Sequence, residues 1–145
     1  MFQFTPPPES DSPCILWTET LSIGHESIDT DHRSIFDTAN RLQAEILEEE
    51  PEHSIVGEVL VELIEHTGGH FEREEALMQS IGFPHLATHR REHALLMRKV
   101  NDLHRQFMDG RNDLSVEVAA FIRNGLIRHI MQSDMELGRW MRAAK

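Results

Sequence analysis

Apolar residues recur every three or four positions along four long stretches of the chain, and this spacing places them on one face of an α-helix. In the first stretch these positions are Ile35, Phe36, Ala39, Leu42 and Ile46. No stretch shows the alternation that is typical of a half-buried β-strand. The pattern therefore predicts helices over residues of about 29–50, 51–80 and 84–110, and from residue 113 past residue 140.

The expected helix boundaries carry the residues that usually start and stop helices. Short polar side chains at Asp29–Asp31 can cap the first helix, and Asn112 or Asp113 can cap the fourth. Gly82 closes the second helix, and Pro84 suits the first turn of the third.

These helices predict an all-α fold, an up-down-up-down antiparallel four-helix bundle formed by residues 17–145. Helices of roughly 20–28 residues are ~30–40 Å long, and short connections make consecutive helices antiparallel neighbours. The proline-rich residues 1–16 are expected to form an irregular N-terminal arm. The apolar side chains that could anchor the next segment to the bundle are Trp17, Leu21, Ile23 and Ile28.

Composition and charge narrow the possible partners. The 145 residues carry a net charge of −11, which argues against nucleic acid or an anionic membrane surface. No apolar run approaches the ~20 residues of a membrane span, and the first residues carry neither the basic segment nor the apolar stretch of a signal peptide, so export is not expected. The single cysteine, Cys14, fits a reducing compartment, so a cytoplasmic location is expected. Ten histidines in so small an acidic chain are unusual.

Seven potential metal ligands lie on the apolar faces of the four helices. His70 and Glu74 are four residues apart, as are His89 and His93, so each pair lies on one helix face. The full set is His32, His70, Glu74, His89, His93, His129 and Asp134. Each residue alone is more often a surface or core residue, but all four helices contribute to this pattern.

Burying these side chains together would be costly without cations. Two divalent ions joined by the two carboxylates would remove that cost, and imidazole with carboxylate suits Fe, Zn, Cu or Ni. Asp134 is the exception in spacing, because five residues after His129 it lies ~140° away in an ideal helix. A sideways reach or a local widening of the helix is needed to bring it in.

The chain resembles the hemerythrin family, specifically its bacterial single-domain members. The resemblance covers residues 17–142 and rests on four motifs, which are Ile28–His32, His70–Glu75 with Leu77-Met78, Gly82–Pro84 leading to His89 and His93, and His129-Ile130 leading to Asp134. It implies two iron ions joined by Glu74, Asp134 and an oxo or hydroxo bridge. One iron would be held by His89, His93 and His129, and the other, with an open position, by His32 and His70.

The family resemblance implies reversible dioxygen binding for storage, delivery or sensing rather than catalysis. The alternatives are a di-iron enzyme that acts on peroxide or nitric oxide, and a metal-stabilised bundle without gas chemistry. The same resemblance implies an apolar pocket over the open position, which would be lined by Ile35, Phe71, Leu126 and Ile130. Ordinary core packing is compatible with these four residues as well.

Two positions depart from the family pattern. Gly125 stands where the family commonly has tryptophan, and His66 stands where bacterial members often have tyrosine. We hypothesise that His66 leans into the space that Gly125 leaves, where it could hydrogen-bond an iron-bound ligand or coordinate iron. The alternatives are tolerated drift at Gly125 and, for His66, a hydrogen bond to a nearby backbone group or carboxylate.

Overall fold

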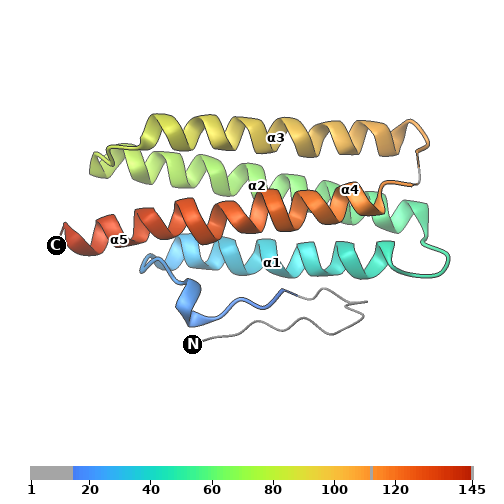
Figure 1. Cartoon of the computed structure of the whole chain (residues 1–145), viewed down its shortest axis with the longest axis horizontal. Helices are drawn as coiled ribbons and strands as arrows, with labels where there is room; N and C mark the ends of the chain where they lie inside the picture. The colour runs from blue at the N-terminus through green and yellow to red at the C-terminus, as the bar shows by residue number, and fades with distance from the viewer. Residues whose placement is uncertain (1–14, 112, 145) are drawn as a thin grey trace.

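The computed structural model describes residues 15–111 and 113–144, and within these residues it contains helices and no strands (Figure 1). The three unbroken helices are α1 (Glu26–Ile46), α2 (His53–Ile81) and α3 (Leu86–Met108). The fourth rod consists of α4 (Ser115–Ala120), the π-helical segments η2 (Phe121–Ile127) and η3 (Ile130–Asp134), and α5 (Met135–Ala143). A short 3-10 turn, η1 (Glu19–Leu21), precedes them.

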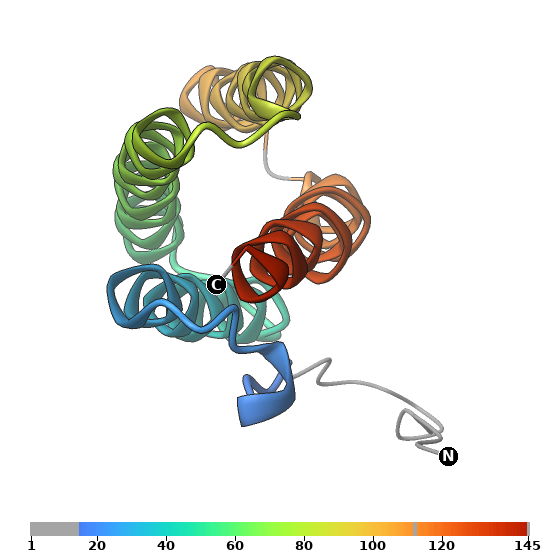
Figure 2. The ribbon, with the colours of Figure 1, turned by 90° about the vertical axis from the view of Figure 1, so that its left-hand side faces the viewer.

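The predicted antiparallel four-helix bundle is confirmed. Seen along the bundle axis, α1 lies beside α2, α2 beside α3, and the fourth rod lies between α3 and α1 (Figure 2). None of the helices described is both long and apolar enough to cross a membrane. Residues 1–14 of the expected N-terminal arm lie outside the described residues.

The segment before α1 is fastened to the bundle. Asn40 forms two hydrogen bonds with Ile15. Its side-chain N–H₂ donates to the Ile15 carbonyl at 2.7 Å, and its side-chain oxygen accepts from the Ile15 N–H at 2.8 Å. The Arg33 guanidinium lies 4.7 Å from the centre of the Trp17 ring. The predicted anchoring role is confirmed, since Trp17 and Leu21 pack against the core.

The start of α1 differs from the prediction. The helix begins before Asp29, and the His25 Nδ1 caps it by accepting from the Ile28 N–H at 3.4 Å. The Asp29 carboxylate instead accepts from the Ile23 N–H at 2.9 Å and from the Ser22 hydroxyl at 2.5 Å. Asp29 therefore ties the incoming chain to the first turn of α1 and is not its cap.

The other boundaries follow the prediction in part. Gly82 ends α2 with a φ of 71°, a left-handed conformation that favours glycine. Leu114 precedes α4 without a side-chain cap, so the cap predicted at Asp113 is wrong. Asp113 instead accepts a hydrogen bond from Arg111 at 2.8 Å, and the alternative cap Asn112 lies outside the described residues.

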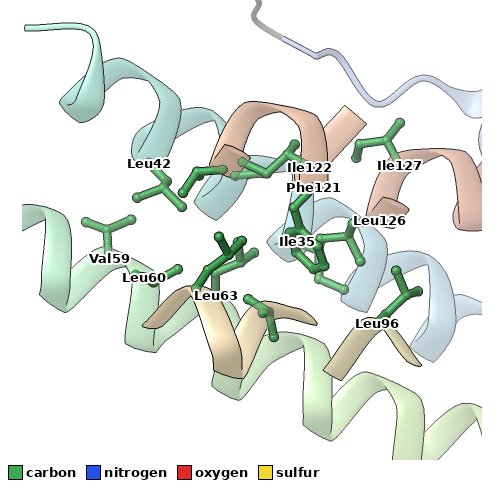
Figure 3. Close-up of a cluster of buried hydrophobic side chains, with 14 of the residues drawn as sticks. Ile35, Leu42, Val59, Leu60, Leu63, Leu96, Phe121, Ile122, Leu126 and Ile127 are labelled. Atoms are coloured by element: carbon green, nitrogen blue, oxygen red, sulfur yellow. The ribbon is translucent and has the colours of Figure 1, made fainter. Parts of the chain in front are cut away.

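The interior is divided into two apolar cores with the seven predicted ligands between them. Figure 3 shows part of the larger core, in which side chains of all four rods meet. The smaller core, at the end where the chain enters α1, consists of Ile23, Ile28, Met78, Phe83 and Leu137. Each rod therefore changes from apolar to polar and back to apolar along its inner face.

Gly138→Ala is expected to destabilise the protein by roughly 1–3 kcal/mol, as overpacking of a core usually does. A Cβ atom at this position would lie 2.9 Å from Ile23 Cβ and 3.0 Å from Ile23 Cα, so backbone would have to move. Urea unfolding measures the change. Gly68→Ala is the matched control, because its Cβ would meet only the flexible end of Met97, at 3.4 Å. Equal stability of the two variants would contradict this account.

Candidate metal centre

All seven predicted ligands meet in one buried layer. The α1 helix contributes His32, α2 contributes His70 and Glu74, α3 contributes His89 and His93, and the fourth rod contributes His129 and Asp134. None of these residues is more than 6% exposed. They form two groups with donor atoms close enough to hold an ion, one with three histidines and one with two. Glu74 and Asp134 belong to both groups.

The imidazoles point their Nε2 atoms at one another. The two Nε2 atoms of His32 and His70 are 3.2 Å apart, and those of His93 and His129 are 3.1 Å apart. Two nitrogens that bind one ion at right angles, each at about 2.1 Å, would be about 3.0 Å apart. The spacing of these nitrogens therefore fits neighbouring ligands of a common cation.

Each carboxylate turns one oxygen to each group. Asp134 Oδ2 lies 2.9 Å from His32 Nε2, whereas Oδ1 lies 3.0 Å from His89 Nε2 and 3.2 Å from His129 Nε2. Glu74 divides in the same way, with Oε2 3.7 Å from His70 Nε2 and Oε1 3.0 Å from His93 Nε2. This is the arrangement of two bridging carboxylates.

The fourth rod widens where Asp134 needs it. In a π-helix the backbone hydrogen bonds join residues five apart, so residues at that separation lie on nearly the same face. The η3 segment is π-helical and ends at Asp134, five residues after His129. Of the two possibilities that the sequence left open, a sideways reach or a local widening of the helix, the structure shows the widening.

Both oxygens of Glu74 are buried and form no hydrogen bond within the described residues. A buried carboxylate without compensation is strongly unfavourable, and it is stabilised when it coordinates a cation. The donor set of five imidazoles and two carboxylates contains no thiolate and suits a transition metal such as iron or zinc rather than calcium or magnesium. The residues present therefore fit a pair of transition-metal ions.

Protons and charges in the layer are strongly shifted. Burial and the neighbouring Asp134 carboxylate raise the pKa of Glu74 to about 7. Burial alone would raise the pKa of Asp134, but the charge and hydrogen bond of His129 hold it well below its usual value. Burial would lower the pKa of His129, yet Asp134 raises it to about 10. The proton favoured on His129 would thus balance the negative charge of Asp134.

Three further carboxylates, which the sequence reading missed, hold the outer nitrogens of the ligand histidines. Asp31 Oδ2 lies 3.2 Å from His70 Nδ1. Glu75 Oε2 lies 2.7 Å from His93 Nδ1, and Glu92 Oε1 lies 2.9 Å from His129 Nδ1. Such contacts fix the tautomer and orientation of a metal-binding imidazole. Their positions could have indicated them, because all three stand directly beside a candidate ligand in the sequence, Asp31 before His32, Glu75 after Glu74 and Glu92 before His93.

The four residues predicted to line the pocket are buried, and Phe71 among them contacts the ligand imidazoles. Ile35, Phe71, Leu126 and Ile130 are at most 3% exposed and belong to the larger core. The Phe71 ring stacks on the His93 ring, with centroids 3.8 Å apart and planes inclined by 7°. The larger core thus reaches the imidazoles directly through Phe71.

The structure places His66 differently from our hypothesis. His66 Nδ1 lies 3.1 Å from the Thr38 hydroxyl, which donates to the Ser34 carbonyl, so His66 donates to Thr38. A Cβ at Gly125 would meet Leu96 at 3.1 Å and Phe121 at 3.5 Å, so these two apolar residues fill the space beside Gly125. Apolar packing there and a threonine partner on α1 replace the expected contact.

Fold and site together define a helical-bundle protein with a histidine-rich cluster in which two carboxylates are shared between two groups that could hold metal. The family model for the hemerythrin HHE cation binding domain matches residues 24–141. The chain belongs to the hemerythrin family.

Several known proteins are similar to this chain. A bacteriohemerythrin of Stenotrophomonas maltophilia is 32% identical over 120 residues, which cover 83% of this chain and 76% of that protein. One of Clostridium acetobutylicum is 30% identical and is covered to 96% of its length by 83% of this chain. A crystal structure of wild-type hemerythrin superimposes with a TM-score of 0.78 at 29% identity, over 86% of this chain and 95% of that one.

Proposed function

We propose that the protein binds dioxygen reversibly at two iron ions held by the seven ligand residues. The observation that carries this proposal is that the two groups of candidate ligands differ in their number of histidines. Glu74 and Asp134 are common to both, but one group adds His89, His93 and His129, and the other adds only two histidines. The ion beside His32 and His70 would therefore have one protein ligand fewer and an open position for a small ligand.

An oxo or hydroxo group would complete the bridge between the irons. The donor set alone is also compatible with zinc, copper or nickel, and the choice of iron rests on membership of the hemerythrin family. When bound, the iron pair supplies the reversible attachment of dioxygen.

The apolar side chains around the ions would exclude water from the site. We propose that Ile35, Phe71, Leu126 and Ile130 line the space over the open position, because these buried side chains offer no polar atom to a water molecule. Displacement of the bound gas by water or small anions would then be slow. Storage, delivery and sensing all fit such a site, and a cytoplasmic location stays a prediction.

Anaerobic loading with ferrous iron is expected to give two iron ions per chain, and air should then produce a visible ligand-to-iron charge-transfer band. The band should disappear when dioxygen is removed and return when it is readmitted. Protein loaded with zinc is the control and should show no band. Sustained consumption of dioxygen with a reductant, in place of reversible cycling, would overturn the binding function in favour of an enzyme.

A further inference from the structure

His70, one of the two histidines in the two-histidine group, has an unusual contact at its outer nitrogen, Nδ1. The Asp31 carboxylate that faces His70 Nδ1 also accepts two hydrogen bonds from Arg73, from Nε at 2.9 Å and from a terminal nitrogen at 2.8 Å. The Asp31 side chain is 13% exposed and that of Arg73 is 52% exposed. A chain of contacts therefore leads from solvent, through a guanidinium and a carboxylate, to a ligand imidazole.

The carboxylates behind the three-histidine group are held differently. Glu92 accepts from the Ser133 hydroxyl, which is uncharged, at 2.7 Å. Glu75 has a single arginine contact, at 3.4 Å from Arg90 Nε. Both lie closer to their imidazoles, at 2.9 Å and 2.7 Å, than Asp31 does at 3.2 Å. Only Asp31, of these three, accepts hydrogen bonds from two nitrogens of one guanidinium.

This difference changes the donor strength of the histidine. A carboxylate at the outer nitrogen raises the basicity of a metal-binding imidazole. A two-point arginine contact draws much of that negative charge to itself. His70 is therefore polarised less by its carboxylate than His93 and His129 are by theirs.

The backbone leaves room for this arrangement. The Arg73 side chain folds back along α2 over Gly69, where a Cβ atom would lie 3.3 Å and 3.4 Å from the two terminal guanidinium nitrogens. Glycine is otherwise unfavourable inside a helix relative to alanine. The small residue at this turn lets the guanidinium reach Asp31 on the neighbouring helix.

We propose that Arg73 is a positioning residue that acts through Asp31 to weaken His70 as a donor and so keeps the two-histidine position the weaker of the two cation sites. The proposal rests on the two-ion site proposed above. It assigns opposite effects to the two partners. Loss of Arg73 frees the full charge of Asp31 and strengthens His70, whereas loss of the Asp31 charge weakens it.

Titration of the metal-free protein with cobalt(II) tests this. Arg73→Gln should tighten binding of the second ion by about 3- to 10-fold, and Asp31→Asn should weaken it by about 10- to 100-fold, the usual range for groups behind a ligand. Arg73→Lys keeps the positive charge but contacts the carboxylate through one nitrogen only. Its affinity for the second ion should therefore lie between those of the wild type and Arg73→Gln. The d–d absorption of the second cobalt should shift in opposite directions in the Asp31 and Arg73 variants.

A purely structural role gives a different result. The Asp31–Arg73 pair joins α1 to α2, and so does the exposed Arg41–Glu62 pair, at 2.9 Å, which touches no ligand. Arg41→Gln is therefore the control and should leave both affinities unchanged. If Arg73→Gln weakens the second site, or leaves it unchanged, the inference is overturned while the two-ion site stands. If the wild type binds no cobalt, both are overturned.

Discussion

Asp134→Asn is expected to reduce cation binding from two ions per chain to one and to weaken the remaining ion more than ~100-fold. Asp134 turns one oxygen to His32 and the other to His89 and His129. Changes behind a ligand already cost 10- to 100-fold in affinity, so loss of a bridging ligand should cost more. The amide also places an N–H₂ donor against one cation. Cobalt(II) titration and metal analysis of the purified variant measure the effect.

Asp37→Asn is the matched control, because it removes the same charge from an exposed position on α1. Its stoichiometry and affinities should equal those of the wild type. Two ions bound at unchanged affinity in Asp134→Asn would show that Asp134 is not a bridge and would remove the main support for a two-ion centre.

The second expected result is an opposite pH dependence of the metal-free and metal-loaded proteins. Without metal, stability should fall as the pH rises from about 6.5 to about 10. Burial would lower the pKa of His70, but hydrogen bonds to Asp134 and Asp31 raise it to about 9, and Asp134 raises that of His129 to about 10. A raised histidine pKa gives stability that is complete below 6.5 and is lost as the pH passes the folded value.

The size of this effect follows from the shifts. At about 1.4 kcal/mol per pKa unit, the change at His70 from 6.5 to about 9 corresponds to roughly 3 kcal/mol. Glu74, whose pKa is raised to about 7, and His93, whose pKa is lowered by burial, act mainly below pH 7. His70 and His129 therefore dominate the pH dependence of stability above pH 7.

Metal binding reverses the trend because cations bind deprotonated imidazoles. The difference in Tm between zinc-loaded and metal-free protein should therefore widen from pH 6.5 to pH 8.5. Thermal unfolding followed by circular dichroism at both values measures it. A difference that stays constant or narrows would mean that protons on these histidines do not compete with the cation.

The clustering of the seven candidate ligands could be predicted from sequence because helical spacing fixes which side chains share a face. His70 with Glu74 and His89 with His93 are one turn apart, so the fold had little freedom to separate them. The spacing of His129 and Asp134 conflicted with a regular helix and left a sideways reach or a local widening open, and the structure shows the widened segment η3. A π-helical segment within an α-helix is frequently found at a functional site.

Contacts between helices were harder to predict. The partners of Asp31 and Glu92 depend on how neighbouring helices are rotated and on which rotamer a long side chain adopts. The spacing of apolar residues along the sequence determines neither. The same reason explains His66, for which the sequence suggested the fourth rod as neighbour but the structure gives Thr38 on α1. The start of α1 was misjudged because Asp29 bonds backward to the incoming chain.

The division of the interior into two apolar cores has a consequence for how the molecule opens. A region with few buried apolar contacts unfolds locally at a lower free energy than the rest. The smaller core, around Met78, Phe83 and Leu137, is such a region, and amide protons in the adjoining helix ends should exchange before those of the larger core. The layer of candidate ligands stands at the boundary between the two cores, so a cation bound there would limit the spread of local unfolding from the smaller core to the larger one.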